Sequence, residues 1–239
     1  MSEWFEHWFG EEYLDLYPHR DDRDAERAVA LLAANGYVRP GQRVLDLACG
    51  AGRHAAALER SGARVIGLDL SLPLLLRAQR RAVAPLVRGD MRRLPLRSAA
   101  FDVVVNLFTS FGYFERDEQH QAVLLEVARV LVSGGVFALD FLNATAVRSA
   151  LVPRDEGTVG ERRVVQERRL SDDGRFVQKT IHMTEEGRSY MERVRLFERV
   201  ELERMLTTAG LAPCAAYGNY DGAPHESWTP RLILVARRP

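Results

Sequence analysis

VLDLACGAGRHA, the stretch from Val44 to Ala55, decides the fold of this chain. An apolar run typical of a buried strand precedes Gly50 and Gly52, which stand in G-x-G-x-x-A spacing before a helical segment. Glycine lets the backbone approach a ligand, and the exposed N–H groups at a helix start favour an anionic or polar partner. The stretch therefore predicts a ligand-binding turn between a strand over 43–48 and a helix over 52–61, although a tight strand-to-helix turn without a ligand has the same pattern.

Short apolar runs alternate with helical segments from residue 43 onward. Continuous apolar strands separated by helices are typical of a parallel sheet that is covered on both faces. The pattern predicts an α/β, doubly wound domain. The further strands are expected at 64–69, 85–90, 101–107, 134–141, 211–218 and 231–238, and the further helices at 22–36, 72–82, 116–131 and 198–209.

Residues 150–197 break this alternation. RRVVQERRL, RFVQKTIHM and RSYMERVRLF read as three strands, joined by turns at Asp173-Gly174 and Glu186-Gly187. We expect an antiparallel β insertion here that acts as a lid or an oligomer contact. The domain then comprises an N-terminal helical cap at 1–36 and a core built from 37–149 and 198–239.

The composition narrows the class of protein. The 239 residues carry 33 basic and 33 acidic side chains, so no net charge attracts the chain to nucleic acid or an anionic membrane. The two cysteines, Cys49 and Cys214, form neither a disulfide framework nor a C-x-x-C site, and the N-terminus lacks the pattern of a signal peptide. We expect a cytoplasmic protein that binds no nucleic acid, no membrane and no metal, since the histidines show no ligand spacing.

Two carboxylates suggest the ligand. Asp69 ends the second expected strand, where an acid can accept both hydroxyls of a ribose; an N-cap role is the alternative, but Ser71 already supplies that cap. Asp46 lies inside the first strand, where it would repel the pyrophosphate of a dinucleotide. An adenosine ligand without phosphates and with a positive centre fits both acids, and S-adenosylmethionine is such a ligand.

At this point the sequence resembles the class I S-adenosylmethionine-dependent methyltransferases, and in particular a bacterial subgroup that acts on small molecules. The resemblance implies a seven-stranded, mostly parallel sheet whose last strand is antiparallel and lies beside the sixth. It rests on ordered segments across residues 43–141 and on the closing strand: VLDLACGAGRHA, VIGLDLS, VRGDMRRLPL, FDVVVNLFTSFGYF, LLEVARVLVSGGVFALD and RLILVARR.

The resemblance also implies which residues hold the cofactor. Gly50 and Gly52 would lie under its methionine part with Asp46 behind them, Asp69 would hold the ribose, and Leu70 would pack on the adenine. The remaining implied contacts come from Ala48 beside the glycines, from Asp90 and Met91 around the adenine, and from Asn106 and Leu107 near the sulfur.

Two tyrosines in the N-terminal segment are further candidates for the cofactor site. Tyr13 and Tyr17 stand four residues apart, on one face of an expected helix. They could close over the cofactor or pack onto the domain. Arg53, in the first turn of the helix after the glycines, is expected to be solvated.

Methyl transfer by in-line displacement requires alignment and exclusion of water, and requires a general base only when the nucleophile is protonated. His225, Tyr113 and Tyr17 are the catalytic candidates, and Tyr220 and Asp140 could also serve as a base. His225 lies in the loop before the last strand. The aromatic run Phe108, Phe111, Tyr113 and Phe114 could form core or could face a substrate.

The sequence thus predicts a methyltransferase that uses S-adenosylmethionine, yields S-adenosylhomocysteine and acts on an O, N or C nucleophile of a small molecule. No Pro-Pro-aromatic segment follows Asn106, which argues against methylation of nucleic acid bases. A protein or RNA methyltransferase, a nicotinamide-dependent oxidoreductase and a non-catalytic cofactor-binding scaffold are the alternatives. A homodimer through the β insertion is also predicted as a possible assembly.

Overall fold

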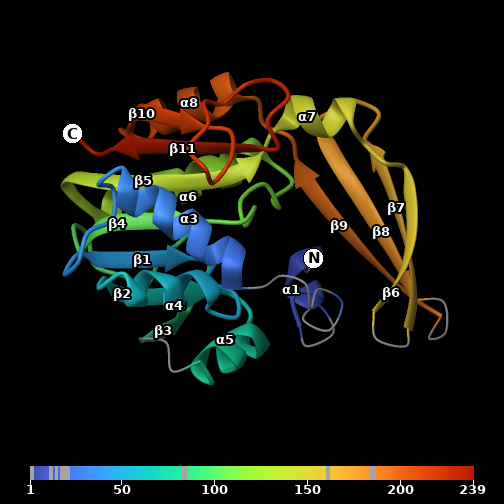
Figure 1. Ribbon diagram of the computed structural model, residues 1–239, viewed down its shortest axis with the longest axis horizontal. Helices are drawn as coiled ribbons and strands as arrows, with labels where there is room; N and C mark the ends of the chain where they lie inside the picture. The colour runs from blue at the N-terminus through green and yellow to red at the C-terminus, as the bar shows by residue number, and fades with distance from the viewer. Residues whose placement is uncertain are drawn as a thin grey trace.

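The computed structural model describes residues 3–10, 13, 16, 22–81, 85–159, 162–183 and 187–239. Two sheets lie side by side, with the short helix α1 (Trp4–Trp8) between them (Figure 1). The larger sheet has seven strands in the order β10-β11-β5-β4-β1-β2-β3, and the smaller has four in the order β6-β7-β8-β9.

The larger sheet has the predicted topology. Strands β1 to β5 are parallel, and β11 runs antiparallel to both of its neighbours, β5 and β10. The strands of this sheet are β1 (Arg43–Leu47), β2 (Arg64–Asp69), β3 (Leu86–Arg88), β4 (Phe101–Asn106), β5 (Leu131–Leu142), β10 (Ala212–Tyr217) and β11 (Arg231–Arg237). The expected doubly wound sheet with an antiparallel last strand is confirmed.

Helices cover both faces of this sheet, which explains why its strands are apolar throughout. Strand residues such as Val44, Val103 and Val105 pack with α3 (Asp22–Ala34) and α4 (Arg53–Arg60). The alternate strand residues pack with α6 (Asp117–Val130) and α8 (Arg199–Thr208) on the other face. The helix α5 (Leu72–Gln79) follows β2, and its N-cap is Ser71, whose hydroxyl accepts the N–H of Leu74.

The insertion has four strands rather than the three that the turns predicted. The additional strand β6 (Arg154–Val159) pairs with β7 (Arg162–Leu170), which pairs with β8 (Phe176–Met183) and through it with β9 (Arg188–Arg195). The charged segment RDEGTV at β6 lacks the apolar alternation that marks a half-buried strand, so its pattern concealed it. A one-turn-and-a-half helix, α7 (Ala144–Ser149), joins the two sheets and was also not predicted.

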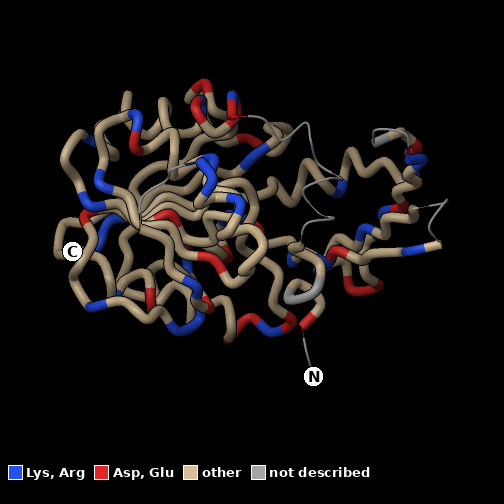
Figure 2. Tube along the Cα trace, turned by 90° about the horizontal axis from the view of Figure 1, so that it is seen from below, with Lys and Arg blue, Asp and Glu red and all other residues tan. Residues whose placement is uncertain are grey.

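Acidic and basic residues are interspersed along the Cα trace (Figure 2). No helix in the described ranges is long and apolar enough to cross a membrane. The equal numbers of acidic and basic residues in the sequence are also mixed along the folded chain.

Candidate active site

The turn after β1 forms one wall of a cavity of about 760 Å³ at the carboxyl ends of the parallel strands. Gly50 and Gly52 have φ of 54° and 79°, in the left-handed region that glycine adopts readily, and Gly52 is the N-cap of α4. A Cβ at Gly50 would meet only the side chain of Leu74, at 3.9 Å. The turn therefore presents backbone to the cavity.

Asp69 orients this turn and lines the cavity. Its carboxylate accepts the N–H of Gly50 and the N–H of Ser71, each at 2.8 Å. Burial raises the pKa of Asp69 against the lowering effect of these hydrogen bonds. The second strand thus contributes an acid to the cavity wall and fixes the backbone of the first turn.

Asp46 lies behind the turn and not on the cavity wall. Only 1% of the residue is exposed, and its Oδ2 accepts no hydrogen bond from the described part of the chain. Burial, with the nearby charge of Asp69, raises the pKa of Asp46 to about 7. A buried carboxylate of this kind gains stability from a positive charge placed beyond the glycines.

The far side of the cavity comes from the segment after β3. Asp90 and Met91, which the resemblance placed around the adenine, both line it. Arg92 donates to both oxygens of Asp90 and also pairs with Glu3 at 2.8 Å. Burial disfavours the charged form of Asp90, but the hydrogen bonds from Arg92 outweigh it and lower the pKa. The sequence analysis missed Arg92, which links this wall to the N-terminal segment.

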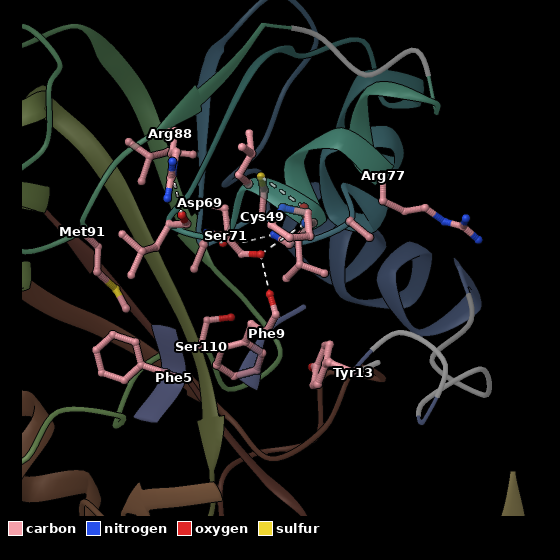
Figure 3. Close-up of a pocket in the computed structure, with 18 of the residues that line it drawn as sticks. Phe5, Phe9, Tyr13, Cys49, Asp69, Ser71, Arg77, Arg88, Met91 and Ser110 are labelled. Carbon is pink, nitrogen blue, oxygen red and sulfur yellow. Dashed lines mark hydrogen bonds between the residues drawn. The ribbon is translucent and has the colours of Figure 1, made fainter. Parts of the chain in front are cut away.

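The N-terminal segment covers the cavity on the side opposite Asp69 and Ser71. Phe5, Phe9 and Tyr13 face Asp69 and Ser71 across it (Figure 3). The hydroxyl of Ser71 donates to the carbonyl oxygen of Phe9, which holds the segment against the start of α5. Tyr17, the other tyrosine predicted for this role, lies outside the described residues.

Two residues at the start of α4 also line the cavity. Arg53, expected to be solvated, is partly buried, and its guanidinium lies 4.8 Å from the centre of the Phe108 ring. Burial lowers its pKa. His54 is 5% exposed, and burial together with the charge of Arg53 lowers its pKa to about 3, so the imidazole is neutral at pH 7.

The other predicted cofactor residues divide between the wall and the layer beneath it. Ala48, Leu70 and Leu107 line the cavity. Gly52 and Asn106 do not: both are buried, and Asn106 donates its side-chain N–H to the carbonyl oxygen of Leu47 at 2.9 Å. Asn106 therefore ties the ends of two neighbouring strands together rather than forming the wall.

A second cavity, of about 520 Å³, lies between the seven-stranded sheet and the insertion. Its apolar lining comes from both sides, including Leu142 and Val147 from the core and Val177 and Val194 from the insertion. The two cavities share four aromatic residues in their walls: Phe9, Tyr13, Phe108 and Tyr113. They therefore meet at an aromatic junction.

The charged side chains of the second cavity occur in opposite-sign sets. Arg168 lies 3.2 Å from Asp155, and Lys179 stands opposite Glu192 in the register of β8 and β9. Arg231 pairs with the buried Asp140. This cavity therefore combines apolar walls with balanced charge.

The aromatic residues after β4 divide between the core and the cavity walls, the two alternatives that the sequence left open. Phe111 and Phe114 are buried, and both rings contact the ring of His120. Phe108 and Tyr113 instead line the junction of the cavities. The hydroxyl of Tyr113 donates to the carbonyl oxygen of Thr109 at 2.6 Å.

His225 lines neither cavity. Its backbone N–H donates to Ala216, and the charges that act on its imidazole come from Glu226 and from α8, namely Glu198, Arg199 and Glu203. Burial lowers its pKa. The loop before β11 folds back on β10, where Pro224 pairs with Tyr217, so the cavities give no support to the prediction that His225 reaches the reacting atoms. Within the described ranges, no group of three or more His, Cys, Asp or Glu side chains could hold a metal.

Comparison with known proteins agrees with this geometry. A family model described as a methyltransferase domain matches residues 44–135. The chain is 32% identical over 182 residues to dTDP-3-amino-3,4,6-trideoxy-alpha-D-glucopyranose N,N-dimethyltransferase of Streptomyces venezuelae, a match that covers 70% of this chain and 74% of that protein.

Two further similarities differ in extent. An uncharacterized methyltransferase of Synechocystis is 41% identical over 116 residues, and the match spans about half of each chain, 48% of this one and 53% of the relative. The structure of the CcbJ methyltransferase from Streptomyces caelestis superposes with a TM-score of 0.82 over 98% of both chains, at 21% identity. That structure includes the insertion as well as the core in its aligned length.

Proposed function

The chain belongs to the class I S-adenosylmethionine-dependent methyltransferases, and from this premise we propose that it methylates a small molecule bound between the core and the β insertion. The observation that carries the proposal is the aromatic junction shared by the two cavities. One cavity has the glycine turn and the acids that suit the cofactor. The second cavity is walled in part by the β insertion, which lies outside the seven-stranded sheet that carries the glycine turn.

The residues of the first cavity fit S-adenosylmethionine. Asp69 takes the ribose hydroxyls, and Leu70, Asp90 and Met91 surround the adenine. The methionine part lies on Ala48 and Gly50, where the unpaired Oδ2 of Asp46 favours the positive charge of the ammonium and the sulfur. Leu107 lies near the sulfur, and Asn106 and Gly52 support the wall from below.

Two further residues extend this set. Arg53, on the cavity wall at the start of α4, is suited to the carboxylate of the methionine part. Tyr13 covers the N-terminal side of the cavity. The role proposed for Tyr17 from the sequence stays a prediction. The charge of Arg53 also balances that of Asp46 across the turn.

The protein contributes alignment and exclusion of water to the reaction. When bound, S-adenosylmethionine supplies a methyl group on a positively charged sulfur that is already a good leaving group. Phe9 and Tyr113 close the junction against solvent, and Phe108 orients the two ligands for in-line approach. Because the hydroxyl of Tyr113 already donates to Thr109, this tyrosine acts by position and not as a base.

We further propose that the acceptor atom is an amine nitrogen. The Streptomyces venezuelae relative is named as an N,N-dimethyltransferase of an amino sugar. The second cavity supports this choice, because its carboxylates, Asp155 and Glu192, can accept hydrogen bonds from a neutral amine. The lone pair of that amine forms the new N–C bond as the C–S bond of the cofactor breaks, and the methylated ammonium product then loses a proton to solvent. A carbon or oxygen nucleophile is the alternative that the assay described below distinguishes.

The insertion is proposed to act as a lid over the acceptor. Arg168, Val177 and Glu192 of its strands line the second cavity, and Trp8 connects it to the N-terminal segment. Deletion of 156–194 should abolish acceptor turnover. If cofactor affinity, turnover and oligomeric state all remained unchanged, the lid would be rejected, and loss of a dimer alone would favour an oligomer contact.

The balanced charge supports a small-molecule acceptor rather than nucleic acid or a membrane surface. The two thiols, Cys49 and Cys214, form no disulfide, which supports the reducing cytoplasm as the compartment.

Calorimetry with S-adenosylhomocysteine and NAD tests the cofactor. We expect binding of the former and none of the latter, and the reverse result would replace the proposal with an oxidoreductase. Turnover of S-adenosylmethionine is then measured with panels of amine, hydroxyl and carbon acceptors. Cofactor binding without turnover in any panel would favour a non-catalytic scaffold, and turnover with RNA or protein alone would reject the small-molecule acceptor.

A further inference from the structure

The turn after β4 has a strained backbone. Phe108 and Thr109 have φ of 62° and 61°, two consecutive residues other than glycine in the left-handed region. Such a conformation is uncommon for residues other than glycine, and most of all for a β-branched residue such as Thr109. It persists only where the surrounding structure holds it in place.

Asp140, in the neighbouring strand β5, provides the main restraint. Its Oδ2 accepts the N–H of Phe108 at 2.9 Å, and its carbonyl oxygen accepts the N–H of Thr109 at 3.1 Å. Both amides of the strained pair are therefore bound by one residue. Asp140 is 0% exposed, so its carboxylate depends on these partners.

A second set of contacts fixes Asp140 and the turn together. Tyr220 donates its hydroxyl to Oδ2 of Asp140 at 2.6 Å, and Arg231 donates to Oδ1. Arg231 also donates to the hydroxyl of Thr109 at 3.2 Å. Burial and the charge of Asp140 raise the pKa of Tyr220, so its phenol remains protonated at neutral pH.

This network ends at the aromatic junction of the two cavities. The Phe108 ring lines both of them, and the Arg231 guanidinium lies 5.5 Å from its centre. Asp140 neutralises that guanidinium. Without the carboxylate, an uncompensated positive charge would remain close to the site proposed for the positive sulfur.

We propose that Asp140 is a positioning residue for methyl transfer: it holds the strained Phe108–Thr109 turn, and hence the Phe108 ring, at the junction, and it neutralises Arg231 there. The inference rests on the proposed function, in which the cofactor fills one cavity and the acceptor the other. Asp140 lines neither cavity and touches neither ligand. It therefore serves as support and not as the general base that its residue type suggested.

Two cofactor analogues report on the junction without an acceptor. S-adenosylhomocysteine has a neutral sulfur and no group at the methyl position, whereas sinefungin places a charged amine there. In Asp140→Asn we expect the Kd of sinefungin to rise about tenfold through the loss of charge compensation and alignment, while that of S-adenosylhomocysteine changes less than about threefold.

Hydrogen exchange measures the turn directly. In Asp140→Asn, the amide of Phe108 should exchange about tenfold faster, since an amide oxygen accepts more weakly than a carboxylate. The amide of Thr109 should change less, because the backbone carbonyl oxygen that accepts its N–H is retained. The matched control is Asp102→Asn, which removes a carboxylate paired with Arg43 at the opposite end of β4 and should change neither measurement. Tyr220→Phe retains the Phe108 bond and should preserve most of the protection.

The double variant Asp140→Asn/Arg231→Gln keeps the proposal testable if the single variant fails to fold, because it leaves no unpaired guanidinium. Faster exchange at Phe108 is again expected. Unchanged exchange and an unchanged ratio of the two Kd values in a folded variant would overturn the proposal. An equal loss of both ligands would also overturn it, by showing a general structural role. If the wild-type chain bound neither analogue, the proposed function would fail instead.

Discussion

At the scale of single residues, the site contains three acids, Asp46, Asp69 and Asp90, whose carboxylates make different contacts. Asp69 lines the cavity and accepts two backbone N–H groups, whereas Asp46 is buried behind the turn with one oxygen unpaired. Asp90 is held by Arg92. Substitution of each acid by a neutral residue is therefore expected to change a different property of the protein.

Asp69→Ala should weaken binding of S-adenosylhomocysteine by about ten- to a hundredfold, through loss of charge-assisted hydrogen bonds to the ribose. Calorimetry measures the affinity, with a thermal melt to establish that the variant is folded. Asp69→Asn is the matched variant, because it preserves the shape and one acceptor for Gly50. An unaltered Kd in both folded variants would remove Asp69 from the cofactor site.

Asp46 should make stability depend on pH. Its folded-state pKa of about 7 lies above the ordinary value of 3.8, so the folded state binds more protons than the unfolded state between these values. The protonated carboxyl of Asp46 therefore stabilises the folded state fully below pH 3.8, and this stabilisation is lost as the pH rises through about 7. The total change is up to about 4 kcal/mol.

Urea unfolding of Asp46→Asn across pH 4 to 8 measures this effect. We expect the variant to be more stable than the wild type at pH 8 and nearly equal at pH 4. Asp102→Asn should be less stable than the wild type at both pH values, because Arg43 lowers the pKa of Asp102 in the folded state and that stabilisation is lost only as the pH falls below the ordinary value of 3.8. Parallel pH profiles of wild type and Asp46→Asn would contradict the assignment.

At the scale of secondary-structure elements, α1 connects the two sheets. Trp8 is 4% exposed, its ring lies 4.4 Å from that of Tyr190, and its indole N–H donates to Glu192 at 2.8 Å. Glu192 lines the second cavity. The contact between α1 and β9 therefore orders a wall of the proposed acceptor site.

Trp8→Ala should destabilise the protein by about 3 kcal/mol through loss of buried aromatic contacts. Turnover should fall mainly through a higher KM for the acceptor, while the Kd of S-adenosylhomocysteine changes less. Trp8→Phe serves as the control that retains packing but loses the bond to Glu192. A larger effect on the cofactor than on the acceptor would place the function of α1 at the first cavity instead.

At the scale of the whole molecule, the cofactor should stabilise the fold because its cavity is formed by segments far apart in the chain. Ligand at a hundred times its Kd adds about 2.7 kcal/mol, which corresponds to a rise in Tm of roughly 5–10 °C for a chain of this size. S-adenosylhomocysteine should produce this shift in a thermal melt and NAD should not. Equal shifts from both ligands would indicate a less selective site.

Much of this molecule could be predicted from local patterns. Apolar strands alternating with helices specify the core because both faces of such a sheet must be covered, and the acid at the end of β2 specifies a ligand edge because parallel strands end together. The charged strand β6 and the short helix α7 lacked any such pattern. Their formation depends on partners elsewhere in the chain.

The sequence by itself indicated the strands and helices of the core and the glycine turn, because periodicity and motif spacing are local properties. The positions of Asp46 and Asp69 in that pattern suggested a ligand, whereas Asp90 was singled out by the resemblance to the methyltransferases. Only the tertiary structure decided that Arg53 lines the cavity, that His225 faces α8 and that Asp140 supports the strained turn at Phe108. The roles of Arg53 and Asp140 depend on contacts between residues more than thirty positions apart in the sequence. The place of His225 depends on the direction in which its loop folds. The position of the proposed acceptor cavity is set in the same way, by the packing of two sheets against one another.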